Sequence, residues 1–308
     1  MYSNYGLTFN PQYLFLFLSL LLLPSCSTDP AEHSQVWGHR GSKPGLFSYP
    51  RAITAGRDLI FAIDRTGRVQ QLDLTGQFVR QWILEKVDNG SPTGMTIDAE
   101  GYLWIPDTHN SRILKYDLEG NLLHQFGSYG EGEGQFIYPT DLAFGDDGNL
   151  YIAEYGVHDR IQVFTPEGKF IRSWGDFGSE PGQFNRPMAI SKGKDGLLYI
   201  TDSVNHRIQV YKQTGELVRM FGKEGEQVEE FKFPYDLDID AEGNLYVCEF
   251  ANHRIQKLTP EGKYLGHWGE MGNAPGQLSE PWGVVVYHSN IYVADSRNNR
   301  LVVFNISP

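Results

Sequence analysis

PTDLAFGDDGNLYIAEYGVHDRIQVFTPEGKFIRSWG, residues 139–175, is one of six related stretches that follow one another along the chain. Residues 234–269 repeat it as PYDLDIDAEGNLYVCEFANHRIQKLTPEGKYLGHWG. The copies begin at prolines spaced by 42, 47, 48, 47 and 47 residues, namely Pro50, Pro92, Pro139, Pro187, Pro234 and Pro281. A repeated unit of this length, built from short strands, predicts a solenoid or a propeller.

Each copy contains four short runs of alternating apolar and polar residues. In the copy quoted first, the predicted strands are residues 141–144, 149–153, 160–164 and 170–174. The short links Asp-Asp-Gly-Asn and Thr-Pro-Glu-Gly between them are typical of tight turns. Four antiparallel strands form one propeller blade, so we predict an all-β, six-bladed propeller.

The last copy has only three of its four strands, because the chain ends soon after residues 300–304. Residues 34–38, SQVWG, match the fourth-strand ending SWG at residues 173–175. We therefore predict that this N-terminal strand completes the sixth blade and closes the ring, packing through Val36 and Trp37. The predicted propeller domain is residues 34–308.

The recurring pattern Gly-Asn-Leu-Tyr, an acidic residue and then Asn-His-Arg-Ile-Gln resembles the NHL repeat, over about nine-tenths of the chain. The resemblance implies a propeller but no particular function. It extends to the family of peptidyl-hydroxyglycine amidating lyases, whose zinc-binding histidines directly follow the repeat prolines. Here no histidine follows them, since these positions hold Arg51, Thr93, Thr140, Met188, Tyr235 and Trp282. We therefore do not expect the zinc site of that family.

The N-terminal sequence predicts an export signal. Nine of the ten residues 14–23, LFLFLSLLLL, are strongly apolar, which is too short a run to span a bilayer. Leu23-Pro24-Ser25-Cys26 resembles the lipobox of bacterial lipoproteins, although residues 1–13 lack Lys and Arg. The resemblance implies a signal peptide over residues 1–25, lipidation of Cys26, a tether over residues 26–33 and a cell-envelope location. Ser27 favours the outer membrane, while a plain secretory signal and an uncleaved anchor remain alternatives.

Composition excludes two function classes. The net charge is −12, whereas nucleic-acid binding requires a basic surface, so we expect no nucleic-acid partner. The only cysteines are Cys26 and Cys248, too few for the RING and B-box zinc modules of many animal NHL proteins. Ubiquitin-ligase chemistry is thereby excluded. We expect a monomer, with Cys248 as a buried strand residue.

Several repeated polar residues suit structural roles. An acidic residue precedes the arginine of each copy by four to six positions. This spacing predicts an ion pair at every connection between second and third strands, which we call the corner. The corner histidines His109, His158, His206 and His253 lie on successive copies, so we expect turn-stabilising hydrogen bonds rather than zinc. The Gly-rich loops between copies end in Phe47, Phe136, Phe184, Phe231 or Leu278, which we expect to fill the seams between blades.

The face that carries the loops between blades and the corners between second and third strands, the loop face, is the predicted binding surface. Large aromatic rings and guanidinium groups suit recognition of a protein or a glycan. The predicted binding residues are Arg51, Tyr155, Tyr235, Phe250, Trp282 and Arg297. We expect Trp282 and Tyr235 to contribute most to binding and little to stability.

The alternative function is a hydrolase or lyase reaction in the central channel. Asp141 and Asp236 follow two repeat prolines by two residues and are weak candidates for binding a divalent cation such as calcium. No other cofactor is predicted. The sequence offers no convergent set of histidines and carboxylates, so a non-enzymatic binding scaffold is the favoured hypothesis.

Overall fold

The computed structural model describes residues 1–2, 34–85 and 90–307. The lipobox with Cys26 and the tether before residue 34 lie outside the described residues. Among the described residues, no helix is long and apolar enough to cross a membrane.

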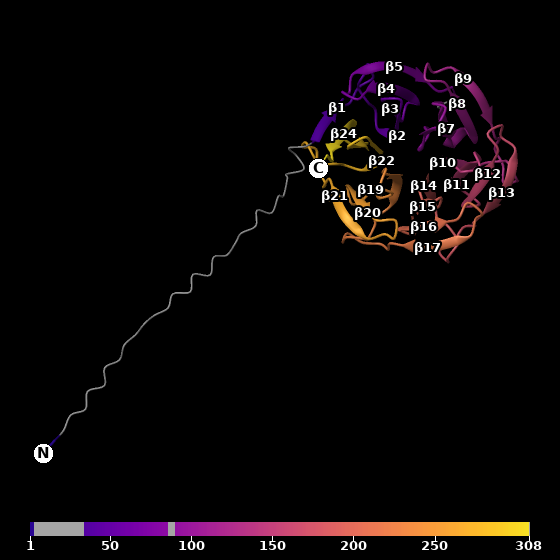
Figure 1. Cartoon of the computed structure of the whole chain (residues 1–308). Helices are drawn as coiled ribbons and strands as arrows, with labels where there is room; N and C mark the ends of the chain where they lie inside the picture. Colours follow the sequence, from indigo (N-terminus) through magenta and orange to yellow (C-terminus); the bar gives the residue numbers. More distant parts are fainter. Residues whose placement is uncertain (3–33, 86–89, 308) are drawn as a thin grey trace.

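The chain forms six antiparallel blades of four strands each, arranged in a ring (Figure 1). Blades 1 to 3 comprise β2 (Pro50–Gly56), β3 (Leu59–Asp64), β4 (Arg68–Asp73), β5 (Phe78–Ile83); β6 (Thr96–Ile97), β7 (Leu103–Asp107), β8 (Arg112–Tyr116), β9 (Leu122–Phe126); and β10 (Tyr138–Phe144), β11 (Leu150–Tyr155), β12 (Arg160–Phe164), β13 (Phe170–Trp174). Blades 4 and 5 comprise β14 (Pro187–Lys192), β15 (Leu198–Asp202), β16 (Arg207–Tyr211), β17 (Leu217–Phe221); and β18 (Pro234–Ile239), β19 (Leu245–Glu249), β20 (Arg254–Leu258), β21 (Tyr264–Trp268). Blade 6 comprises β22 (Pro281–Tyr287), β23 (Asn290–Asp295), β24 (Arg300–Asn305) and β1 (Ser34–Trp37), and a short 3₁₀ helix, η1 (Thr108–Asn110), lies in blade 2. The predicted all-β, six-bladed propeller is therefore confirmed.

The N-terminal strand closes the ring as predicted. β1 pairs antiparallel with β24, with Ser34 opposite Phe304 and Trp37 opposite Leu301, and Figure 1 shows the two strands side by side. The prediction that both Val36 and Trp37 pack was wrong for Val36, which is 39% exposed, whereas Trp37 is buried. Side chains alternate between the two sides of a strand, so Trp37 alone of this pair points inward.

Apolar residues fill the seams between blades. Each core cluster combines residues of neighbouring blades, as where Phe47 packs with Ile60 of blade 1 and Leu301 of blade 6. The five predicted seam residues are fully buried: Phe47, Phe136, Phe184, Phe231 and Leu278. The ring is therefore held together by burial between adjacent blades.

Every blade carries the predicted ion pair at its corner. The nitrogen-to-oxygen distances are 2.5–2.8 Å in the pairs Arg68–Asp64, Arg112–Asp107, Arg160–Glu154, Arg207–Asp202, Arg254–Glu249 and Arg300–Asp295. The same guanidinium groups also donate to carbonyl groups of the preceding loop; Arg300, for example, donates to Asn273 and Gln277 at 2.7 and 2.8 Å. Each arginine therefore fixes both its own corner and the loop beside it.

The first strands of the blades (β2, β6, β10, β14, β18 and β22) surround the channel, while the fourth strands lie on the circumference (Figure 1). In five of the six blades the strand pairing brings the repeat proline beside the acidic residue of the corner, as with Pro234 and Glu249. The prolines therefore mark the loop face, and the residues after them descend toward the opposite face.

Candidate functional site at the channel mouth and in the channel

Residues just before the repeat prolines adopt a strained conformation at the loop face. The φ angles of Tyr49, Arg186, Phe233 and Glu280 are 56, 61, 51 and 49°, in the left-handed region that favours glycine. Backbone strain of this kind persists only where the surrounding structure holds it, and it is concentrated at functional sites.

Corner side chains of the preceding blade hold these residues in place. The backbone N–H groups of Phe233 and Glu280 donate to Nδ1 of His206 and His253 at 3.1 and 3.0 Å. These two histidines thus have a structural role, as predicted, but their hydrogen bonds join neighbouring blades rather than stabilise a turn. The corresponding acceptors in other blades are Asn299 for Tyr49, at 3.0 Å, and the Asp159 carboxylate for Arg186.

The two remaining corner histidines make different contacts. His109 packs edge-on against Tyr138, with ring centroids 5.6 Å apart. His158 lies 3.8 Å from the Glu131 carboxylate and 3.7 Å from that of Asp176.

Four of the six predicted binding residues pack together at the channel mouth around Trp282. Its ring centroid lies 4.8 Å from that of Tyr235 and 5.7 Å from that of Phe250. The Arg51 guanidinium lies 4.9 Å from the centroid of the same ring. These four residues and Tyr49, whose ring meets Trp282 at 6.2 Å, form what we call the mouth cluster. Blades 1, 5 and 6 contribute to it, together with the loop before blade 1.

The other two predicted residues join this cluster through neighbours. Arg186 lies 4.9 Å from the ring centroid of Tyr155 and 5.9 Å from that of Tyr235. Arg297 forms an ion pair with Glu280 at 2.5 Å, and Glu280 also accepts a hydrogen bond from the Tyr49 hydroxyl at 3.2 Å. All six predicted residues thus belong to one connected network, although their role in binding stays a prediction.

Trp282 is more deeply placed than the sequence suggested. Its side chain is only 9% exposed, whereas Tyr155, Tyr235 and Phe250 are half-buried. The expectation that Trp282 contributes little to stability is therefore contradicted by its packing, because removing a buried indole leaves a cavity.

The mouth holds two arginines without a carboxylate partner. Among the residues that the structure describes, neither Arg51 nor Arg186 has a carboxylate within ion-pair distance. The Nε atoms of both arginines and Nε1 of Trp282 are buried and meet no acceptor in the described part of the chain. Burial, together with the positive charges of Arg65 and Arg186, lowers the pKa of Arg51. Arg51 also donates from Nη1 to the Ser91 carbonyl at 3.4 Å, so the mouth combines two positive charges that have no ion-pair partner among the described residues with donors that are only partly used.

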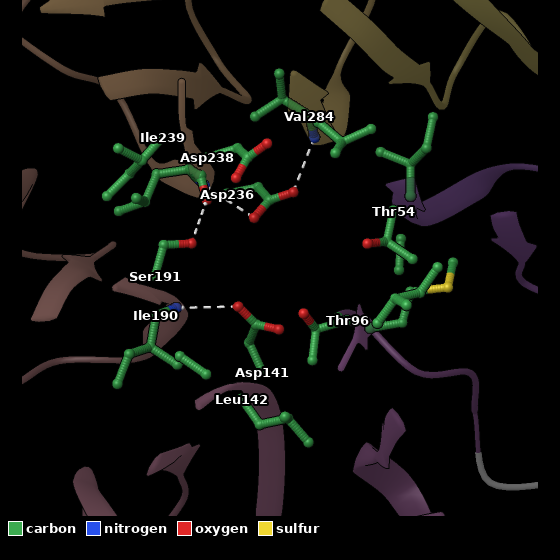
Figure 2. Close-up of a pocket in the computed structure, with 18 of the residues that line it drawn as sticks. Thr54, Thr96, Asp141, Leu142, Ile190, Ser191, Asp236, Asp238, Ile239 and Val284 are labelled. Carbon is green, nitrogen blue, oxygen red and sulfur yellow. Dashed lines mark hydrogen bonds between the residues drawn. The ribbon is translucent and has the colours of Figure 1, made fainter. Parts of the chain in front are cut away.

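Below the mouth lies a cavity of about 280 Å³. It is lined by residues of all six first strands and of the loop before β6, from the second residue after the repeat proline downward. Figure 2 shows polar side chains pointing into it, those of Thr54, Thr96, Asp141, Ser191, Asp236 and Asp238.

The three carboxylates bind the neighbouring blade. Asp141 accepts the backbone N–H of Ile190 at 3.0 Å, and Asp236 accepts that of Val284 at 2.8 Å (Figure 2). Asp238 accepts the N–H of Val286 at 2.7 Å. Each aspartate thereby links its own first strand to that of the next blade.

The pKa values of these three carboxyl groups are raised. Burial, followed by the charge of Asp238, raises the pKa of Asp141 to about 7, and burial raises that of Asp238 to about 6. Burial and the neighbouring Asp141 raise the pKa of Asp236 well above its usual range. A carboxyl group with a pKa near neutrality can act as a general acid or base.

The polar groups in the cavity fit a metal ion poorly. Zinc takes four nitrogen, sulfur or oxygen ligands and calcium takes six to eight oxygens. Across residues 34–85 and 90–307, no group of three or more His, Cys, Asp or Glu side chains gathers in a way that could hold a metal. In addition, both predicted candidates, Asp141 and Asp236, already use one oxygen on a backbone N–H.

Sequence reasoning missed Arg186, Tyr49 and Asp238. The first two precede a repeat proline, whereas the candidate mouth residues were sought after the prolines. Asp238 lies two positions beyond Asp236 on β18, so strand alternation places it on the same side and could have revealed it.

The family model of the NHL repeat matches residues 184–211 and 278–304. A probable peptidyl-alpha-hydroxyglycine alpha-amidating lyase of Caenorhabditis elegans is 27% identical over 133 residues, which is 39% of this chain and 38% of that protein. The protein brain tumor of Drosophila melanogaster is 31% identical over 74 residues, 24% of this chain and 7% of that protein. The chain thus matches well under half the length of either curated relative.

Solved structures of propellers are similar over most of the chain. A streptogramin B lyase superposes with a TM-score of 0.65 at 17% identity, covering 91% of this chain and all of that one. A gluconolactonase of Xanthomonas campestris gives 0.65 at 13% identity, covering 89% and 98%. A Bacteroides thetaiotaomicron protein of unknown function gives 0.70 at 14%, covering 89% and 76%. At these identities the likeness concerns the fold alone.

Proposed function

We propose that this six-bladed propeller with NHL repeats is a binding scaffold that takes a protein or glycan ligand on its loop face. The observation that carries the proposal is the mouth cluster, in which Arg51, Tyr235, Phe250 and Trp282 gather from three blades. Aromatic residues and arginines dominate the energy of interfaces because they bury large areas at low entropic cost.

We further propose that the scaffold is anchored to the cell envelope by a lipid on Cys26 and acts as a monomer. The support is the lipobox-like stretch Leu23-Pro24-Ser25-Cys26 that follows an apolar run. The predicted anchor would join the propeller through β1, on the rim of blade 6.

The test measures capture of envelope components by the immobilised full-length protein. Tyr235→Ala and Phe250→Ala should each weaken capture by about 2 kcal/mol, roughly thirtyfold. The matched control is Tyr287→Ala, which removes a half-buried aromatic residue at the other end of β22 from Trp282. Pretreating the components with protease or with periodate separates protein from glycan ligands. Undiminished capture by both cluster variants would refute the proposal.

A second candidate function is a hydrolase or lyase reaction in the channel. The observation that favours it is that Asp141 and Asp236 face one cavity with raised pKa values, of which that of Asp141 is about 7. The similarity to an amidating lyase supports the reaction class. No histidine follows the repeat prolines, so the chemistry would rest on the carboxyl groups.

This candidate makes the opposite prediction for the same variants. With lactones and peptidyl-α-hydroxyglycines as substrates, Asp141→Asn or Asp236→Asn should lower turnover by about a hundredfold, the usual contribution of a general acid or base. Tyr235→Ala should leave turnover nearly unchanged. Metal analysis of the purified protein is the companion measurement, because a stoichiometric ion would favour the channel reaction over binding.

A further inference from the structure

We infer that the ligand of the mouth is an acidic sugar, whose carboxylate or sulfate group binds between Arg51 and Arg186 and whose ring packs against Tyr155 and Tyr235. The inference rests on the proposed binding function and names the chemical class of its ligand.

The first argument is uncompensated positive charge. The six corner arginines of the propeller each pair with a buried carboxylate, whereas Arg51 and Arg186 pair with none among the described residues. Both side chains are half-buried, so water cannot fully solvate their charges in place of a carboxylate partner. In a chain with a net charge of −12, two arginines without an ion-pair partner among the described residues suit an anionic ligand.

The second argument is that the two guanidinium groups flank the same space. They are joined through successive contacts, because Arg51 lies over Trp282, Trp282 contacts Tyr235, and Tyr235 contacts Arg186. Burial raises the pKa values of Tyr155 and Tyr235, and the charges of Arg51 and Arg186 both oppose this rise. The charge of Arg186 also acts on Arg51, so an anion placed between them would be attracted by both arginines.

The third argument is preorganisation. Aromatic rings position each guanidinium, with its central carbon 4.9 Å from the ring centroid for Arg51 over Trp282 and for Arg186 over Tyr155. The N–H edges of a guanidinium are its hydrogen-bond donors, and they match the oxygens of carboxylate or sulfate in pairs. The backbone of Arg186 is fixed as well, by its N–H bond to Asp159.

The exposed part of the mouth is small. Trp282 is 9% exposed, and Tyr155 and Tyr235 are half-buried. A ligand therefore meets chiefly the exposed parts of the two tyrosine rings. A sugar ring offers apolar C–H faces to the half-buried rings of Tyr155 and Tyr235.

The experiment titrates the full-length protein with three oligosaccharides of equal length, one built from uronic acids, one sulfated and one neutral. We expect the uronate or the sulfated sugar to bind and the neutral one to bind at least about tenfold more weakly. Arg51→Gln and Arg186→Gln should each weaken acidic-sugar binding by about tenfold or more. Arg51→Lys should recover part of the affinity, because it restores the charge without the paired donors.

The matched control is Arg65→Gln, which removes an exposed arginine from the same face. If Arg65→Gln weakened acidic-sugar binding as much as Arg51→Gln does, the effect would be a general attraction between the positively charged face and the anion. The proposed site would then be wrong. Free sulfate or acetate binding as tightly as the acidic sugars would overturn the role of the ring. Melting curves of all variants identify any loss that comes from unfolding.

The outcome can be told apart from failure of the binding function itself. If acidic and neutral sugars bind equally or not at all while Tyr235→Ala still abolishes envelope capture, the inference is wrong and the scaffold proposal stands. If Tyr235→Ala also leaves capture unchanged, both are wrong.

Discussion

The backbone N–H of Glu280 donates a hydrogen bond to Nδ1 of His253 across the seam between blades 5 and 6, at 3.0 Å. His206 makes the equivalent bond to Phe233 one seam earlier, at 3.1 Å. Both bonds require that Nδ1 carry no proton, so these two seams depend on neutral histidines.

Acid should therefore weaken the ring through His206 and His253. Burial lowers the pKa of both side chains, so the folded protein binds their protons less readily than the unfolded chain. Their contribution is complete above the ordinary histidine pKa of about 6.5 and is lost as the pH falls below it. Melting temperatures between pH 8 and pH 5 should fall less in the double variant His206→Gln/His253→Gln than in the wild type. A control is His288→Gln, which replaces an exposed histidine and should preserve the wild-type slope.

The channel carboxylates should act in the opposite direction. The pKa of Asp141 is raised to about 7 by burial and by Asp238, so the folded protein holds this proton more tightly than the unfolded chain does. Stability from this group is present below about pH 4 and is lost as the pH rises toward 7. Asp141→Asn should thus gain stability relative to wild type with rising pH, by on the order of 1–3 kcal/mol above pH 7. Denaturant unfolding at several pH values measures this gain in stability. The control is Asp176→Asn, which replaces an exposed aspartate. A gain that does not depend on pH, or an equal gain in the control, would contradict the prediction.

Closure of the ring should depend on Trp37 and hardly on its neighbour. Trp37 is buried against Tyr292, with ring centroids 5.5 Å apart, whereas Val36 on the same strand is 39% exposed. Trp37→Ala should lower the free energy of unfolding by about 3–5 kcal/mol, while Val36→Ala should change it by less than about 0.5 kcal/mol. Similar losses in the two variants, measured by denaturant unfolding, would contradict the side-chain placement.

The corner ion pairs should be costly to break from one side. Asp202 is fully buried and receives hydrogen bonds from Arg207 and Asn205. Arg207→Ala leaves this carboxylate without its cation and frees the loop carbonyls of Ser179 and Gln183, so we expect a loss of about 3–5 kcal/mol. The exposed Arg65→Ala should cost little. If chemical denaturation showed only a small decrease in the free energy of unfolding for Arg207→Ala, water would be replacing the arginine as the partner of Asp202, and the prediction would be wrong.

The lipid anchor can be tested directly in a bacterial host. Cys26→Ala should abolish labelling by a fatty-acid analogue and release the protein from membranes, because the lipobox-like stretch places the lipid on Cys26. Cys248→Ala is the matched control, since this second cysteine is buried in β19. Continued labelling of Cys26→Ala would remove the anchor from the proposed function.

The repeat made most of the fold predictable, since blade boundaries and corners follow from local turns and from residues that recur in every copy. β10 begins at Tyr138 rather than at the predicted residue 141, because Tyr138 and Pro139 already pair with β11. Such a start depends on the partner strand, which local patterns do not show.

The mouth was less predictable because it is built from the positions at which the copies differ. Periodicity placed Tyr235 and Trp282 after their prolines, but not the 4.8 Å contact between their rings. That contact depends on the rotation between blades 5 and 6. Arg186 was missed for a related reason, since its importance comes from the absence of a partner, which only three-dimensional structure reveals.

The pairing of β1 with β24 also makes closure of the ring depend on synthesis of both strands. Ser34 pairs with Phe304 across the blade, so the ring cannot close until residue 304 has left the ribosome. Contacts so distant in sequence form late in folding. A chain cut short by a premature stop would keep sound individual blades but expose unpaired strand edges on both sides of a gap. Such products should be degraded rather than retained as partly active fragments, so the closing strand serves as a check on the completeness of the chain.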